Sequence, residues 1–129
     1  MQKKQWNFRT QQEAKKRIET LGISDLKFEL IKGPVDATVP VFARKLIKID
    51  ILCIDLDLYS GYQTVLRYLY PLLSSKGVIC LDDYGHTKWP GCQKAVDEFL
   101  ILNPNLTIIQ SDFGKHYIQN NLVTSEALI

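Results

Sequence analysis

The chain has 129 residues, 46% of them hydrophobic, which is enough to bury one core but too little for two ordinary domains. Its formal net charge of +2, from 16 basic and 14 acidic residues, lacks the strong one-signed field that nucleic acid or an anionic membrane attracts. We therefore expect one domain over residues 1–129, with no nucleic-acid and no membrane partner.

The first third of the chain predicts a helix followed by a strand. A capping box at Thr10 and Glu13 precedes apolar residues at helical spacing, so a helix is expected over about 11–21. Residues 26–31 alternate between apolar and polar side chains and end at Gly33 and a proline. That pattern predicts a strand closed by a turn.

The rest of the chain alternates strand-like apolar runs with stretches in which apolar residues recur at helical spacing. The expected strands lie at 49–56, 78–81, 106–109 and 116–119, and the expected helices cover 62–69 and 92–100. The first of these strands is nearly continuous in apolar residues, which is typical of a strand buried on both faces of a parallel sheet. The alternation predicts an α/β fold with a mostly parallel sheet between helix layers.

Cysteine usage and the amino terminus indicate the compartment. The three cysteines, Cys53, Cys80 and Cys92, are odd in number and lack the spacing of a zinc site. Two of them lie in strand-like runs, which favours buried, reduced thiols. The first nine residues have no apolar signal core, and no apolar run approaches the roughly 20 residues that span a bilayer. A cytoplasmic protein is the expectation.

Acidic residues follow two successive strands of the expected sheet. Asp55 and Asp57 lie on one side of the first strand end by alternation, and Asp82 and Asp83 follow the next strand. Ligands in open α/β sheets bind beyond the carboxyl ends of the strands. Clustered carboxylates raise one another's pKa unless a cation lies between them, and their oxygens suit Mg²⁺, Mn²⁺ or Ca²⁺ better than zinc. A hard divalent cation is therefore expected here, although any single aspartate can instead cap a helix or line a turn.

Five short runs follow one another in a fixed order between residues 54 and 99. They are Ile54-Asp55-Leu56-Asp57-Leu58-Tyr59, Leu69-Tyr70-Pro71-Leu72, Gly77-Val78-Ile79, Asp82-Asp83-Tyr84-Gly85 and Gly91-Cys92-Gln93-Lys94-Ala95-Val96-Asp97-Glu98-Phe99. In order and spacing they resemble the macrocin O-methyltransferase family. The resemblance implies a Rossmann-like methyltransferase sheet in three αβα layers, with S-adenosylmethionine and Mg²⁺ as cofactors. It also implies a hydroxyl of a sugar or small natural product as the methyl acceptor.

The resemblance also implies roles for individual residues. Asp55, Asp82 and Asp83 would be the metal ligands, and Gly33 and Asp55 would contact the cofactor. Asp57 would be a base or a substrate contact. Resemblance to the family is weaker over residues 11–40, where a turn is expected at Thr38, Val39 and Pro40.

A metal-dependent mechanism follows from the expected site. Coordination to a divalent cation lowers the pKa of a sugar hydroxyl and fixes its position. Asp57, or with less support His86, would accept the proton before the oxygen attacks the sulfonium methyl group. The alternative for His86, a lone histidine in a glycine-containing loop, is a solvent-exposed residue without a chemical role.

The usual glycine-rich turn for the cofactor is not found before residue 50. Comparison with the family indicates a chain that begins after the second strand of the sheet. The expected strand 26–31 would then either pair with 49–56 or remain an exposed edge, through which a homo-oligomer can form. We accordingly expect weak or absent S-adenosylmethionine binding by this chain alone.

The sequence is also compatible with two other functions. A non-catalytic remnant would keep the α/β core and weak metal affinity but would transfer no methyl group. A phosphatase of the haloacid dehalogenase type is suggested by Asp55-Leu56-Asp57 after an apolar strand. Tyr59 stands where that motif expects threonine or valine, and the second acidic pair follows too closely for that fold.

Overall fold

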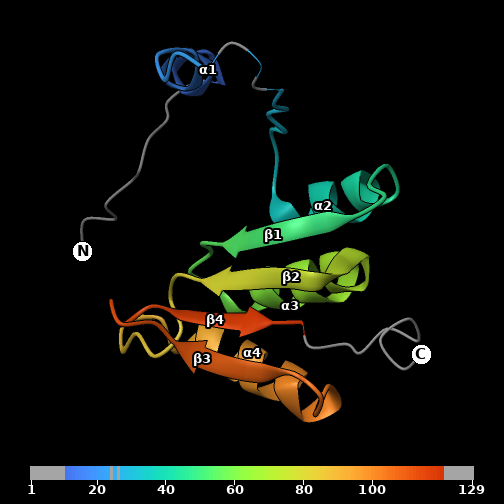
Figure 1. Cartoon of the computed structure of the whole chain (residues 1–129), viewed down its shortest axis with the longest axis vertical. Coiled ribbons are helices and arrows are strands. Elements are labelled where there is room, and N and C mark those ends of the chain that lie inside the picture. Colours follow the sequence, from blue (N-terminus) through green and yellow to red (C-terminus); the bar gives the residue numbers. More distant parts are fainter. Residues whose placement is uncertain (1–10, 24, 26, 121–129) are drawn as a thin grey trace. The chain divides into compact units, whose positions relative to one another are not determined.

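The computed structural model describes residues 11–23, 25 and 27–120. The chain divides into two compact units, Met1–Gly33 and Pro34–Ile129, and its elements are labelled in Figure 1. The single domain expected over residues 1–129 stays a prediction.

The described part of the first unit contains one helix. Helix α1 (Gln11–Glu19) confirms the expected helix, ends two residues early and has no buried residue. Thr10 of the expected capping box lies outside the described residues, as does Leu26. The strand expected over 26–31 is wrong, because residues 27–31 form neither helix nor strand and are exposed. Alternation alone does not hold a strand that has no neighbour to pair with its backbone.

The second unit contains a four-stranded sheet in the order β1-β2-β4-β3. The strands are β1 (Ile49–Ile54), β2 (Leu73–Leu81), β3 (Thr107–Gln110) and β4 (His116–Gln119). Strands β1 and β2 pair in parallel, whereas β2 with β4 and β3 with β4 pair antiparallel. The expectation of a mostly parallel sheet is therefore wrong for this unit. Five residues join β3 to β4, and a connection that short can only form an antiparallel hairpin.

Three helices accompany the sheet: α2 (Val35–Ala43), α3 (Tyr59–Leu69) and α4 (Pro90–Leu102), with a short 3-10 helix, η1 (Tyr70–Leu72), after α3. Helices α3 and α4 confirm the expected helices. No helix in the described part of the chain is long and apolar enough to cross a bilayer.

Helix α2 is absent from the sequence expectations, and the turn expected at Thr38, Val39 and Pro40 lies inside it. Its apolar residues Val35, Val39 and Ala43 recur every four positions and pack against the core, which is the period of one helical face. The internal proline hid that pattern, because proline ordinarily ends a helix. Pro40 is tolerated here as the sixth residue of a helix only nine residues long.

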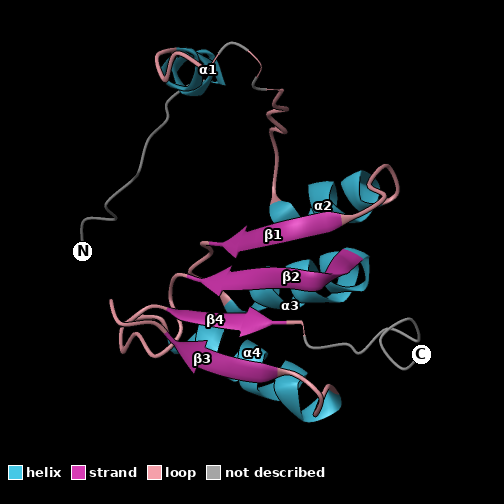
Figure 2. Cartoon of the chain, viewed as in Figure 1, coloured by secondary structure: helices cyan, strands magenta, loops and turns pink. Residues whose placement is uncertain are grey.

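The core lies between the sheet and these helices, which lie behind the sheet in Figure 2. Leu52 and Ile54 of β1 are buried on this side, whereas Ile51 is 68% exposed and Cys53 is exposed on the other. Strand β1 thus has one buried face, not the two expected from its sequence. Residues 34–120 place helices on one face of their sheet and do not form the second helix layer of an αβα arrangement. The remaining core residues are Tyr62, Val65, Leu66, Leu69, Leu73, Ile79, Leu81, Cys92, Ala95, Val96, Leu106 and Ile118.

Candidate metal site

The parallel pairing of β1 with β2 brings the acidic segments together. Ile54 and Leu81 are register partners at the ends of the two strands, and the Asp82 amide N–H donates to the Ile54 carbonyl oxygen at 3.1 Å. The two segments that follow β1 and β2 therefore leave the sheet side by side. Asp55 follows one strand immediately, and Asp82 and Asp83 follow the other, as the sequence predicts.

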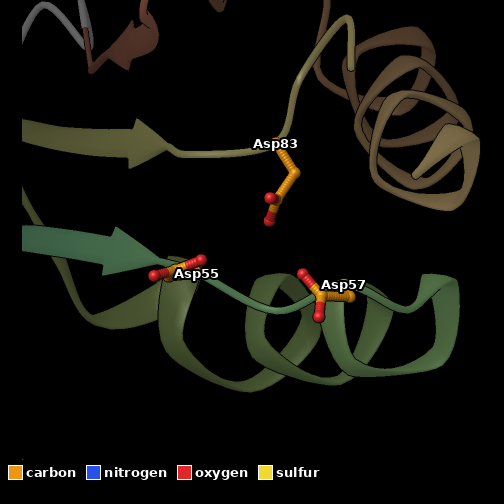
Figure 3. Close-up of side chains that lie close together, drawn as sticks. All are labelled: Asp55, Asp57 and Asp83. Atoms are coloured by element: carbon orange, nitrogen blue, oxygen red, sulfur yellow. The ribbon is translucent and has the colours of Figure 1, made fainter. Parts of the chain in front are cut away.

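Three carboxylates converge at this edge of the sheet. Asp55, Asp57 and Asp83 each offer one oxygen, and these oxygens all lie within 4.8 Å of one another. Figure 3 shows the Asp83 side chain reaching from the segment after β2 towards the two aspartates that follow β1. Asp55 and Asp57 are exposed, whereas Asp83 is only 5% exposed. Exposed oxygens beside a buried one form an open, all-oxygen donor set, which fits a hard cation such as Mg²⁺.

The raised pKa values of Asp55 and Asp83 indicate that negative charge on these carboxylates is unfavourable. Burial raises the pKa of Asp55, and a hydrogen bond with Asp82 and the charges of Asp82, Asp83 and Asp57 raise it further. Burial also raises the pKa of Asp83, with contributions from the charges of Asp82 and Asp57, although the hydrogen bond from Tyr62 opposes the rise. A cation among these carboxylates would relieve both the desolvation and the mutual repulsion.

Asp82 has a protein cation as its partner. The Lys115 ammonium lies 2.8 Å from Asp82 Oδ1 and 3.2 Å from the Asp82 carbonyl oxygen. This hydrogen bond lowers the pKa of Asp82. The structure therefore groups Asp57, rather than Asp82, with Asp55 and Asp83. Lys115 is not predictable from the sequence, because only the pairing of β4 with β2 carries the turn before β4 to this edge.

Tyr62 fixes the buried member of the group. Its ring is fully buried in α3, and its hydroxyl lies 2.8 Å from Asp83 Oδ2 and 3.2 Å from the Ile54 carbonyl oxygen. Burial raises the pKa of Tyr62, so the hydroxyl stays protonated and can donate to Asp83. The sequence predicts Tyr62 only as a residue on the apolar face of a helix. It does not predict the hydrogen bond, because tyrosine fits such a face whether or not its hydroxyl has a partner.

The other expected site residues lie outside this group. His86 is exposed in the segment after β2, where its Nδ1 accepts from the Lys88 amide at 3.2 Å and its own amide donates to the Asp83 carbonyl oxygen at 3.0 Å. These bonds shape the loop. Gly33 belongs to the first unit, so the structure gives it no position relative to the acids.

A surface cavity of about 570 Å³ lies elsewhere in the second unit. Helices α2, α3 and α4 line it, with Asp36, Thr64, Arg67 and Glu98 among its polar residues. None of the three clustered aspartates lines this cavity. It is therefore separate from the candidate metal site.

Comparisons with known proteins agree with this fold. The family described as macrocin-O-methyltransferase (TylF) matches residues 3–111. The O-methyltransferase NovP is 25% identical, with a TM-score of 0.77 over 88% of this chain and 46% of its own. CalS11, described as a TDP-rhamnose 3'-O-methyltransferase of calicheamicin biosynthesis, is 28% identical, with a TM-score of 0.60 over 70% of this chain and 40% of its own.

A third solved structure shares the fold alone. It is the SAH-bound methyltransferase PaMTH1 of Podospora anserina, which is 21% identical, with a TM-score of 0.55 over 84% of this chain and 54% of its own. No curated protein matches the chain significantly. The chain spans about half the length of these solved structures, or less. The likeness to NovP and CalS11 confirms the expected α/β methyltransferase fold.

Proposed function

This chain belongs to the macrocin-O-methyltransferase family, and on that premise we propose that it forms the metal-binding part of an S-adenosylmethionine-dependent O-methyltransferase. The proposed acceptor is a hydroxyl of a sugar or small natural product. NovP and CalS11 are both O-methyltransferases, and CalS11 is described as acting on a TDP-sugar. Both cofactors and the acceptor class are part of the proposal.

The observation that carries the proposal is the convergence of three carboxylates at the ends of two adjacent parallel strands. Asp55, Asp57 and Asp83 offer oxygens within 4.8 Å of one another at the edge where open α/β sheets bind their ligands. A divalent metal held there by these three aspartates would lower the pKa of an acceptor hydroxyl and would fix its position. The raised pKa values of Asp55 and Asp83 support a cation as the occupant.

The residues around the three carboxylates have distinct proposed roles. Tyr62 holds Asp83 in place through its hydroxyl, and Lys115 neutralises Asp82 beside the group. We assign Asp57 to the cation, because its oxygen lies with those of Asp55 and Asp83. His86, three residues after Asp83 and exposed, is then the remaining candidate for accepting the proton of the acceptor.

A methyl-transfer assay on the full-length gene product tests the proposal. Transfer of a tritiated methyl group from S-adenosylmethionine would be measured on nucleotide sugars and glycosylated natural products, with Mg²⁺ and with a chelator. We expect transfer that the chelator abolishes and that Asp83→Asn lowers by at least about 100-fold, which corresponds to about 3 kcal/mol of lost stabilisation. Transfer that is indifferent to both would contradict the metal-dependent mechanism.

A non-catalytic remnant is the second candidate, because the chain covers only 46% of NovP and 40% of CalS11. The methyl-transfer assay distinguishes the two candidates, because a remnant transfers no methyl group, and calorimetric titration of S-adenosylmethionine tests whether this chain alone holds the cofactor. We expect weak or absent binding, and micromolar affinity would show a complete cofactor site. Turnover of a generic phosphate ester in parallel tests the phosphatase alternative, which family membership does not favour.

A further inference from the structure

We propose that Cys53 and Cys80 form a vicinal dithiol site that binds trivalent arsenicals by bridging β1 and β2. The site lies on the face of the sheet opposite the helices. It does not depend on the proposed methyl transfer.

The strand register places the two cysteines directly opposite one another. Cys53 and Cys80 are Cα partners in the parallel pairing of β1 with β2. The pairs on either side, Leu52 with Ile79 and Ile54 with Leu81, are buried in the core on the helix side. Since successive side chains of a strand point to opposite faces, both cysteines point to the other face of the sheet.

This face is open among residues 34–120. Cys53 is exposed and Cys80 is partly exposed, and Ile51 beside them is 68% exposed. Cys92 is fully buried in α4, against the opposite side of the sheet. Two of the three thiols are therefore accessible neighbours, and the third is neither accessible nor close to them in the sheet.

The spacing of the two strands suits one atom that bridges the two sulfurs. Neighbouring strands lie about 4.8 Å apart, and side chains on paired residues of parallel strands leave the sheet side by side. Both thiols are free, and a disulfide between them would need an oxidant as well as a sulfur to sulfur bond of about 2.05 Å. Two bonds of about 2.3 Å from sulfur to one bridging atom, the length of a zinc thiolate bond, leave the sulfurs about 3.5 to 4 Å apart. Such a bridge suits two thiols that lie close enough to share a hydrogen bond, as those of Cys53 and Cys80 do.

An arsenical with one organic group uses two thiols and requires no oxidant. In phenylarsine oxide, the arsenic–oxygen bond is lost as two sulfur–arsenic bonds form. The oxygen leaves as water with the two thiol protons, so that arsenic stays trivalent. The second bond forms within the same molecule, which raises the affinity above that for a single thiol by about 100-fold to 10,000-fold.

The test is to incubate this chain with phenylarsine oxide in the presence of excess glutathione, a competing monothiol. Intact mass and titration of free thiols then measure what is retained. We expect one arsenical for each chain and the loss of two of the three free thiols, reversed by dithiothreitol. Cys53→Ser and Cys80→Ser should each lower the affinity by at least about 100-fold.

Cys92→Ala is the matched control and should retain the arsenical as the wild type does, with circular dichroism verifying the fold of each variant. Both tested serines replace side chains on the exposed face, so they leave the core intact. The proposal is overturned if the wild type retains no arsenical against glutathione. It is also overturned if either serine variant retains it as tightly as the wild type.

Discussion

Tyr62 is fully buried in α3, yet its hydroxyl lies 2.8 Å from Asp83 Oδ2 at the exposed end of the sheet. A buried carboxylate with one fixed hydrogen bond has a defined orientation, and partners of this kind position the ligands of metal sites. The hydroxyl also lies 3.2 Å from the Ile54 carbonyl oxygen, directly before Asp55. One side chain thus connects the helical core to both acidic segments.

Replacing Tyr62 with phenylalanine removes this hydroxyl and keeps the ring in the core. We expect Tyr62→Phe to weaken Mg²⁺ or Mn²⁺ binding by about 10-fold to 100-fold, because Asp83 loses its positioning partner. The free energy of unfolding should fall by about 1 to 3 kcal/mol, because a buried acceptor is left unsatisfied. Titration calorimetry measures the affinity, with Tyr68→Phe on the exposed side of α3 as the control. Equal affinities for both variants and the wild type would contradict a positioning role.

The pKa of Asp55 predicts how stability changes with pH when no metal is bound. Its pKa is raised in the folded chain, so its contribution to stability is present below about pH 3.8 and is lost as the pH rises through the raised value. Asp55→Asn cannot ionise and escapes this loss. We therefore expect the variant to be more stable than the wild type at pH 7 in a chelator, and the difference to shrink towards pH 4. Denaturant unfolding at both pH values measures it.

Asp82→Asn is the matched control with the opposite sign. Lys115 lowers the pKa of Asp82, so the carboxylate stabilises the folded chain above about pH 3.8 and ceases to do so as the pH falls through the lowered value. This variant should be less stable than the wild type at pH 7. Destabilisation by both asparagines alike would show that Asp55 is not under repulsion.

The sequence predicts only the site residues that follow a strand directly. Asp55, Asp57, Asp82 and Asp83 follow two apolar runs directly, so strand alternation and the sheet-edge rule predict their convergence. Tyr62 and Lys115 arrive there through the packing of α3 and the pairing of β4 with β2. No local pattern encodes those contacts, so the sequence alone leaves both residues out.

At the scale of elements, α3 and α4 approach closely where both helices begin. A Cβ on Gly91 would lie 2.8 Å from the Tyr59 backbone nitrogen and 3.2 Å from its Cα. Backbone atoms cannot rotate away as the end of a side chain can. The close approach of the two helix starts therefore depends on a residue without a side chain.

Gly91→Ala tests this contact. Alanine favours a helix over glycine by about 1 kcal/mol, so propensity alone predicts a more stable protein. The clash with Tyr59 should outweigh it and lower the free energy of unfolding by about 1 to 3 kcal/mol, as overpacking does. Chemical denaturation measures the change, with the exposed Gln93→Ala in the same helix as the control. A stability equal to or above that of the control would show that the two helices can separate at no cost.

The elements predicted correctly are those with a strong period and a partner close in sequence. Helices α3 and α4 and the four strands of the sheet follow from apolar spacing between turn residues. The strand expected at 26–31 failed because strand formation needs a paired neighbour, which alternation does not guarantee. The sequence does not predict helix α2, because a proline such as Pro40 ordinarily ends a helix, although Val35, Val39 and Ala43 share one face.

At the scale of the whole molecule, the buried core belongs to one of the two units. Among the described residues, the buried core lies between Leu52 and Ile118, and α1 of the first unit has no buried residue. A chain that begins at Pro34 should therefore unfold cooperatively within about 4 °C of the complete chain, a shift of roughly 1 kcal/mol. Thermal unfolding followed by circular dichroism measures the two midpoints. Loss of the cooperative transition would show that residues 1–33 contribute to the core.

Strand β1 forms an edge of the sheet, where a strand of another copy can pair with it. In the described part of the chain its only strand partner is β2, so its other edge presents unpaired backbone groups. Association of two copies through a sheet edge was expected at 26–31. We now propose β1 as that edge, because residues 27–31 form no strand.

The proposed chemistry requires one hard cation held by Asp55, Asp57 and Asp83. Electron paramagnetic resonance tests this directly, because Mn²⁺ loses its free-ion spectrum when it binds. We predict one Mn²⁺ for each wild-type chain and at least about 10-fold weaker binding by Asp83→Asn. Asp50→Asn, at the opposite end of β1, should bind as the wild type does. Absence of Mn²⁺ binding by the wild type, or equal affinity of the wild type and both variants for Mn²⁺, would contradict the proposed site.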